Sequence, residues 1–246
     1  MPRFYLPQFL IPGQTYDLPP DILQHIKVLR LHPNESIALF DGEGNEWHAS
    51  LIQQDKRSAS VKILESLPTH TESPLKIHIA QGIARGEKMD FILQKATELG
   101  ATALTPLTTQ FCTVKIHSDR KAHKQDHWQK IIISASEQCG RATLMSLQAP
   151  QSLSDFLNLV GQRSDSPSLL KLILHPKDPE ITLKTLPASL THLILLIGPE
   201  GGLSPHELTL AEHAGFLRLS LGPRVLRTET AALAAISALQ GVRGDF

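Results

Sequence analysis

Cysteine is almost absent from this chain of 246 residues, which contains only Cys112 and Cys139. Two thiols cannot form the disulfide framework of a small secreted domain, and their spacing matches no zinc motif. We therefore expect two buried thiols in a cytoplasmic protein that holds no metal. No apolar run is long enough to cross a bilayer. The sequence also lacks the basic start and apolar block of a secretory signal, so no association with a membrane is expected.

An excess of charge of one sign is also lacking. Lys and Arg together number 24, as do Asp and Glu, so the formal net charge is zero. This balance argues against a protein that coats nucleic acid through bulk positive charge. With 41% hydrophobic and 20% charged residues, the composition is that of a globular protein with a core, in one large domain or two small ones.

The first seventy residues predict a small β unit. Short runs separated by Gly- and Asp-containing turns are typical of a meander or a small barrel, and here they are Ser36–Phe40, Glu46–Gln53 and Ala59–Leu64. The segment Asp21–Leu31 has the apolar spacing of a short helix. The polar, Pro-containing stretch 67–74 has the composition of a linker and ends this unit.

After Pro74 the pattern changes to alternating strands and helices. Such alternation predicts a mostly parallel sheet with helices on its faces, and near-continuous apolar runs are typical of strands that are covered on both sides. The helix after Ser204 begins with a capping-box sequence, Ser204 to Glu207. The expected strands are Leu75–Ala80, Ala103–Leu107, Leu169–Leu174, Leu193–Ile197 and Phe216–Leu221; the other expected helices are Lys88–Leu99, Lys121–Gln138, Ser152–Val160 and Thr228–Leu239.

Two loops rich in Gly and Pro follow the last two expected strands. The first is Ile197–Ser204 and the second is Leu219–Ala231. Open α/β sheets bind ligands at the carboxyl ends of their strands, so both loops are candidates for one cofactor pocket. The first loop has neither the lysine of a Walker A loop nor a dinucleotide fingerprint, which makes ATP and NAD poor candidates. It suits a ligand that is read by backbone groups, such as an adenine ring, although a tight turn with positive φ at Gly201 or Gly202 would explain the same residues.

Arg227 is the residue of the second loop that local structure does not explain. Thr228 is expected to be the N-cap of the following helix, and Glu229 suits the positive end of that helix. The charge of Arg227 opposes the same helix end, so we expect this side chain to face a ligand or an interface. In contrast, Arg141 follows Gly140 at a helix C-terminus, where a cation is electrostatically ordinary.

The segments IGPEGGLSPHE (197–207) and LGPRVLRTETAAL (221–233) resemble the ribosomal RNA small subunit methyltransferase E family, which belongs to the knotted SPOUT class. These two paired motifs are specific. Weaker matches in the same order extend the resemblance over essentially the whole chain, at Pro2–Tyr5, His25–Arg30, Arg85–Met89, Glu98–Gly100 and Glu137–Arg141.

The resemblance implies a fold that the residue pattern alone does not predict. It implies a PUA-like β-barrel that binds RNA over residues 1–70 and an α/β SPOUT methyltransferase domain with a trefoil knot over residues 74–246. Chain physics alone would exclude the knot, because true knots are rare. The resemblance also implies a homodimer, in which Ala231–Leu239 is a plausible interface helix.

The activity that the resemblance implies is methylation of N3 of one uridine in 16S ribosomal RNA, with S-adenosylmethionine as the cofactor. The expected partner is small-subunit ribosomal RNA in the assembled subunit. Two alternatives remain open. One is a non-catalytic RNA-interaction protein that binds S-adenosylmethionine as a structural ligand, and the other is a knotted methyltransferase that acts on transfer RNA.

Three sets of site residues follow. Uracil N3 carries a proton that must leave, so the catalytic candidates are Arg227 to stabilise the anion and Glu229 or Glu200 as the base, with water as the alternative acceptor. The candidates for RNA binding are Arg3, Arg30, Arg85, Lys88 and Arg141. The candidates for cofactor binding are Leu174, His175, Ile197, Gly198, Pro199, Glu200, Gly201, Gly202, Leu219, Ser220, Leu221, Gly222, Val225 and Leu226.

Overall fold

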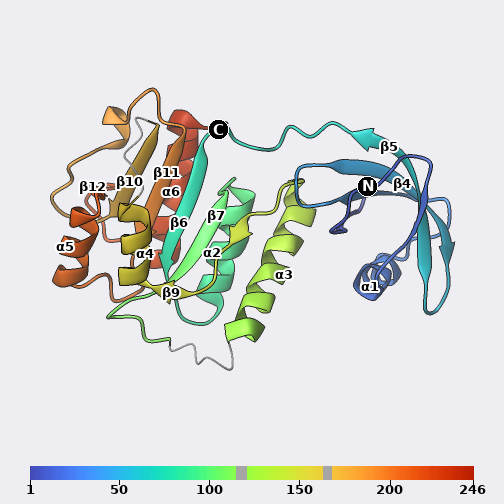
Figure 1. Ribbon diagram of the computed structural model, residues 1–246, viewed down its shortest axis with the longest axis horizontal. Helices are drawn as coiled ribbons and strands as arrows, with labels where there is room; N and C mark the ends of the chain where they lie inside the picture. The colour runs from blue at the N-terminus through green and yellow to red at the C-terminus, as the bar shows by residue number, and fades with distance from the viewer. Residues whose placement is uncertain (115–120, 163–167) are drawn as a thin grey trace. The chain divides into compact units, whose positions relative to one another are not determined.

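The computed structural model describes residues 1–114, 121–162 and 168–246, which form two compact units (Figure 1). The first unit consists of residues 1–72 together with residues 133–144, and the second consists of residues 73–132 and 145–246. A segment from the middle of the chain is thus counted with the N-terminal unit, whereas the residue pattern assigned all residues after 74 to one domain.

The first unit is built on a five-stranded sheet with the order β1-β3-β4-β5-β2. The strands are β1 (Arg3–Tyr5), β2 (Thr15–Asp17), β3 (Ser36–Phe40), β4 (Glu46–Gln54) and β5 (Ala59–Leu67), and the helix α1 spans Pro20–Val28. Alternate residues of β4 face the core, where Trp47, Ala49 and Leu51 are buried with Ile26 of α1. The expected β unit is present. The strands β1 and β2 were not predicted, because three residues carry too little alternation to be recognised.

Residues 133–144 complete the first unit through main-chain contacts. The amide of Gly44 donates to the carbonyl oxygen of Ala142 at 3.2 Å, and the amide of Leu144 donates to that of Gly42 at 2.9 Å. The side chain of Glu137 accepts the amide of Tyr5 at 3.0 Å. These pairs are far apart in sequence, so no local pattern could have indicated them.

The second unit contains a parallel sheet with the order β12-β10-β11-β6-β7-β8, and β9 also pairs with β7. This confirms the predicted mostly parallel sheet. The strands are β6 (Lys76–Gly82), β7 (Ala103–Thr108), β8 (Ser146–Leu147), β9 (Gln151–Ser152), β10 (Leu169–Leu174), β11 (His192–Ile197) and β12 (Leu217–Leu219).

Helices cover both faces of this sheet. Figure 1 shows α4 in front of the strands and α6 behind them. Phe156 of α4 and Ala211 of α5 pack into one core cluster with Ile194 and Leu196 of β11, while α2 packs against α6. The helices are α2 (Glu87–Glu98), α3 (Lys121–Cys139), α4 (Leu153–Gly161), the 3₁₀ helix η2 (Leu183–Thr185), α5 (Pro205–His213) and α6 (Thr228–Arg243).

The predicted capping box at the start of α5 is confirmed. The Ser204 hydroxyl accepts the amide of Glu207, and the Glu207 carboxylate accepts the amide of Ser204 at 2.8 Å. The expectation for the cysteines was wrong in one respect: Cys112 and Cys139 are unpaired, but they are half-buried rather than buried. Within the described residues, no helix is long and apolar enough to cross a membrane, and no group of three or more His, Cys, Asp or Glu side chains could hold a metal ion.

Candidate functional site

A cavity of about 730 Å³ lies at the carboxyl ends of β10, β11 and β12. The three strands are neighbours in the sheet, because β10 pairs with both β11 and β12. The loops that follow them therefore meet, as expected for a ligand site in a parallel sheet. The volume falls in the range of small-molecule and cofactor pockets.

The structure brings almost all of the predicted cofactor residues to this one cavity. The exception is Ser220, which lines a neighbouring depression between the second loop and α6. Several residues that line the cavity were not predicted as cofactor residues. Arg224 lies inside the second motif, whereas Lys88 comes from α2, and no sequence signal places a residue of that helix beside these loops. The other residues missed as cofactor candidates are Pro176, Leu203, Leu208, Arg227, Thr228 and Ala231.

The loop after β11 is shaped by close backbone approaches. Gly202 has φ +71°, a conformation that favours glycine, and its amide donates to the Pro199 carbonyl oxygen at 2.9 Å. A Cβ atom on Gly198 would lie 3.0 Å from the carbonyl carbon of Gly202, and one on Gly82 of β6 would lie 2.5 Å from Pro199 Cδ. The glycines thus allow a tight turn that also presents backbone N–H and C=O groups beside the cavity.

Thr228 joins this loop to α6. Its hydroxyl donates to the Gly198 carbonyl oxygen at 2.7 Å and accepts from the side-chain amide nitrogen of the buried Gln81 at 3.0 Å. The expectation that Thr228 caps α6 was wrong, because Arg227 is the N-cap residue and Thr228 is the first helical residue. The hydroxyl bonds to residues that are distant in the chain and does not cap the helix. The sequence around Thr228 does not indicate these distant partners.

Arg227 lines the cavity in an exposed position with extended backbone angles (φ −63°, ψ 151°). Across the part of the chain that the structure describes, its guanidinium makes no hydrogen bond or ion pair. A cation at a helix N-terminus is also electrostatically disfavoured. Arg227 is therefore available to an anionic group that enters the cavity.

Lys88 and Glu200, which line the cavity, form a charged cluster with Glu229, which is not among the lining residues. Lys88 Nζ lies 3.4 Å from Glu200 Oε1 and 3.6 Å from Glu229 Oε2. Glu200 Oε1 also accepts the amide of Arg85 at 3.0 Å. Burial opposes ionisation of Glu200, but the amide donors of Arg85 and of Glu200 itself, together with Lys88, outweigh it and hold the pKa of Glu200 below its usual value.

Glu229 differs from Glu200 in how its oxygens are satisfied. Its side chain is only 15% exposed. Oε2 is shielded from solvent and has no hydrogen-bond partner among the described residues. A buried acceptor without a donor is unfavourable and uncommon, so it commonly marks a functional position or a missing ligand.

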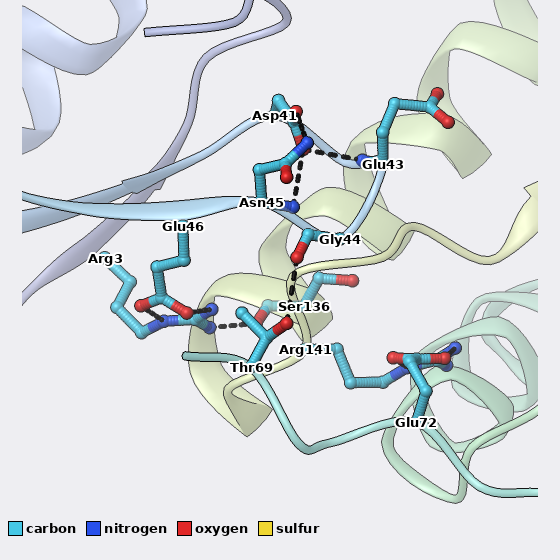
Figure 2. A network of polar contacts seen from close by, with 10 residues as sticks. All are labelled: Arg3, Asp41, Glu43, Gly44, Asn45, Glu46, Thr69, Glu72, Ser136 and Arg141. Carbon is cyan, nitrogen blue, oxygen red and sulfur yellow. Dashed lines mark hydrogen bonds and ion pairs between the residues drawn. The ribbon is translucent and has the colours of Figure 1, made fainter. Parts of the chain in front are cut away.

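The five arginine and lysine residues predicted to bind RNA are found in different surroundings. In the first unit, Arg3 donates to both oxygens of Glu46 and to the Ser136 carbonyl oxygen, and Arg141, only 3% exposed, donates to both oxygens of Glu72 (Figure 2). Arg30 is exposed. In the second unit, Arg85 is exposed and its Nε donates to Thr113, while Lys88 lines the cavity. The charges of Arg3 and Arg141 are thus engaged inside the protein.

Comparison with known proteins identifies the family to which this chain belongs. A family model of an RNA methyltransferase domain matches residues 71–240, and a model of an RNA methyltransferase PUA domain matches residues 18–64. The ribosomal RNA small subunit methyltransferase E of Buchnera aphidicola is 33% identical over 100% of this chain and 98% of its own length. The chain belongs to the ribosomal RNA small subunit methyltransferase E family. Its first unit is accordingly PUA-like, as the resemblance implied.

Solved structures of relatives share the fold over the whole chain. The Neisseria gonorrhoeae member of the family, described as bound to S-adenosylmethionine, is 42% identical with a TM-score of 0.92 and covers 100% of this chain and 99% of its own. A putative methyltransferase from Legionella pneumophila, described as a complex with the same cofactor, is 44% identical with a TM-score of 0.92, covering 99% of this chain and 98% of its own.

Proposed function

We propose that this chain transfers a methyl group from S-adenosylmethionine to N3 of a uridine in small-subunit ribosomal RNA, in the cytoplasm. The observation that carries the proposal is the cavity at the ends of β10, β11 and β12, in a chain of this family. Its residues fit the cofactor: the turn 198–202 offers backbone groups to an adenine ring, and Leu174, Ile197 and Leu226 offer apolar walls. When bound, S-adenosylmethionine supplies a methyl group that its sulfonium already activates.

Arg227 stabilises the substrate in this proposal. Uracil N3 becomes a good nucleophile only after its proton has left, and the resulting negative charge spreads over the two carbonyl oxygens. A fixed cation beside the cavity lowers the energy of that anion without having to reorganise during the reaction. Arg227 lines the cavity and its guanidinium has no other partner among the described residues, so it is available to hold such an anion once the substrate is bound.

The proton acceptor is chosen among Glu229, Glu200 and water. A carboxylate whose pKa is lowered holds a proton weakly, and this counts against Glu200. Glu229 Oε2 has no hydrogen-bond partner among the described residues, but it is shielded from solvent and Glu229 does not line the cavity, which counts against Glu229. We therefore favour water, and Glu229 and Glu200 are the acceptors to be tested against it.

The PUA-like unit is proposed to contact the RNA, and the assembled small subunit is the proposed substrate. The match to a PUA domain of RNA methyltransferases supports this role. Arg30 and Arg85 keep exposed positions and are the stronger candidates for phosphate contacts, because Arg3 and Arg141 are engaged in ion pairs. Neutralising Arg30 should weaken binding and lower the salt slope by about one unit for one lost phosphate contact.

A knotted C-terminal region is proposed as well. What supports it is the path of the chain: it leaves β12 at the edge of the sheet and begins α6 at Thr228, which bonds to the loop after β11 and to Gln81 of β6.

A homodimer through α6 is the quaternary arrangement that we propose. Ala234 and Ala238 are partly exposed beside the neighbouring depression, so they permit the close approach of a second helix. Ala238→Arg should shift sedimentation from dimer to monomer. Ala235 is unsuitable for this test because it is fully buried in the core.

The proposed activity is tested by mapping the modified nucleotide. Small-subunit RNA from cells with the protein should block reverse transcription at one uridine, and RNA from cells without it should not. A block in transfer RNA instead would indicate an enzyme acting on that substrate. Tight binding of S-adenosylmethionine without methyl transfer to any RNA would indicate a non-catalytic protein.

A further inference from the structure

Phe111 is an exposed aromatic residue beside the cavity that the proposed function does not use. Its side chain is 43% exposed. It belongs to the loop after β7, and because β11, β6 and β7 are parallel neighbours, this loop begins at the same edge of the sheet as the cavity. Single exposed apolar residues are common on protein surfaces, so exposure alone indicates no function. The surroundings of Phe111 distinguish it from such residues.

The loop that carries Phe111 is bonded to its neighbours on both sides of this residue. The amide of Gln110 donates to the Glu207 carboxylate at 2.7 Å. The thiol of Cys112 donates to the Ile83 carbonyl oxygen at 3.4 Å. A backbone that is held in this way presents the ring from a fixed position, which lowers the entropy that a contact with a ligand would cost.

Phe111 also contacts the turn that borders the cavity. Gly201 lines the cavity, and a Cβ atom on this glycine would lie 2.8 Å from Cβ of Phe111. Phe111 itself is not among the lining residues, so it lies next to the cavity and not inside it. The ring is therefore placed to contact a group that lies outside the cavity but close to whatever the cavity holds.

A cation accompanies Phe111 on this surface. Arg85 is exposed, its amide donates to Glu200 Oε1 at 3.0 Å, and its Nε donates to the hydroxyl of Thr113, two residues after Phe111. In the described part of the chain, the two Nη atoms of Arg85 have no hydrogen bond or ion pair. An exposed aromatic ring and an arginine with free donors suit single-stranded RNA, because an unstacked base packs on the ring and a phosphate binds the cation. RNA is also the substrate of the family to which the chain belongs.

We propose that Phe111 and Arg85 form a subsite for a nucleotide next to the target uridine. The base of that nucleotide stacks on the ring of Phe111, and a phosphate beside it contacts the Nη atoms of Arg85. A base that reacts inside a cavity has to leave the stack of its neighbours. The neighbouring base thereby loses a stacking partner, which Phe111 replaces. The inference rests on the proposed function only in that the substrate is RNA, and it does not depend on which atom is methylated.

The first experiment measures the affinity of the full-length protein for isolated small subunits at several salt concentrations. Phe111→Ala should weaken binding by about five- to a hundredfold, the usual effect of losing one stacked base, and should leave the salt slope unchanged because no charge is lost. Phe111→Trp should keep the affinity of the parent protein, whereas Phe111→Leu should weaken binding nearly as much as Phe111→Ala. Arg85→Met should weaken binding and lower the salt slope by about one unit. Unchanged affinity in Phe111→Ala would overturn the proposal.

Two further measurements on Phe111→Ala separate stacking from a structural role. The affinity for S-adenosylmethionine by calorimetry and the oligomeric state by sedimentation should equal those of the parent protein. A loss of cofactor affinity would show that Phe111 supports the turn at Gly201. A change in oligomeric state would show that it contacts a second copy of the chain. Either result would contradict the proposal.

Phe246 provides the matched control in the same unit. It is 66% exposed and follows the end of α6, where Gln240 accepts a hydrogen bond from Ser73 just ahead of β6. This places Phe246 toward the edge of the sheet that is opposite the cavity. Phe246→Ala should leave the affinity for small subunits unchanged. An equal loss of affinity in Phe246→Ala and Phe111→Ala would contradict a specific subsite.

The second experiment locates the contact on the RNA. The photoreactive amino acid p-benzoylphenylalanine replaces Phe111 in the full-length protein, the complex with small subunits is irradiated, and reverse transcription maps the cross-linked nucleotide. The cross-link should fall beside the methylated uridine, and the same amino acid at position 246 should give no cross-link there. A cross-link confined to other parts of the RNA or to protein would contradict the proposal. If mapping finds no methylated nucleotide, the proposed function fails, while the affinity series still decides whether Phe111 binds RNA.

Discussion

Arg141 of the first unit and Arg227 of the second show how the same residue type can serve two purposes. Arg141 is buried and donates to both oxygens of Glu72 (Figure 2). Arg227 is exposed beside a cavity, and the described residues offer its guanidinium no acidic partner. A buried charge must be paired inside the protein. An unpaired charge beside a pocket is available to a ligand of opposite charge.

This difference predicts that the two residues separate stability from activity. Loss of Arg141 should damage the fold of the first unit and affect chemistry only through it. Loss of Arg227 should damage chemistry and leave the fold intact. Each variant is thus a control for the other. A variant that lowered stability and activity equally would contradict the difference between the two arginines.

Arg227→Ala is expected to have the largest effect. Removing a group that stabilises the developing anion typically costs about a hundred- to a thousandfold in turnover. Single-turnover rates at saturating cofactor should show this loss, while calorimetry should show a modest change in S-adenosylmethionine affinity. Arg227→Lys should recover only part of the rate, because a point charge does not reproduce a bidentate guanidinium. Collapse of cofactor affinity with near-normal single-turnover rates would instead assign Arg227 to cofactor binding.

Arg141→Met should destabilise the first unit by about 3 kcal/mol, because it leaves Glu72 without its buried partner. Trp47 is buried in the core of this unit, so its fluorescence during chemical denaturation reports on it, with Trp128→Phe as the background. Arg57 is an exposed arginine of the same unit, and Arg57→Met should change stability by no more than about 0.5 kcal/mol. Equal losses of stability in the two variants would show that the Arg141–Glu72 pair stabilises the first unit no more than an exposed arginine does.

Glu200→Gln should lower stability at neutral pH by a smaller amount. The pKa of Glu200 is below its usual value in the folded protein, because the Arg85 amide and Lys88 outweigh the effect of burial. A carboxylate of this kind stabilises the fold above its unfolded pKa, and the contribution disappears as pH falls through the folded pKa. The difference between variant and parent in denaturation midpoint should therefore vanish in acid. A difference that is independent of pH would contradict this reasoning.

Glu137→Gln should have the smallest effect, with the opposite sign. Burial raises the pKa of Glu137, and the amide of Tyr5 compensates only in part. Ionisation of this group therefore disfavours the folded state at neutral pH, and the neutral form is favoured as pH falls. Glutamine keeps an acceptor for the Tyr5 amide and carries no charge, so the variant should be more stable than the parent at neutral pH. The two should become equal below the ordinary pKa of glutamate, and a less stable variant at pH 7 would contradict the prediction.

Much of the second unit could be predicted because its signals are local. The strand β10 was predicted at the bounds that it has, and the capping box at Ser204 is formed as expected. The meeting of the loops after β10, β11 and β12 could be anticipated from a general property of parallel sheets. Thr228 was assigned incorrectly, because its local role as a cap competes with a long-range contact to Gly198.

The sequence by itself determined the order of the longer strands and helices, the turns that need glycine, and the family, since each of these depends on residues that are neighbours in the chain. Only the tertiary structure decided which charges are paired. It placed Lys88 between Glu200 and Glu229, paired Arg141 with Glu72, and added residues 133–144 to the first unit. These outcomes depend on residues that are distant in the chain and are brought together by packing within each of the two units. The pattern of a single helix or loop carries no information about such partners.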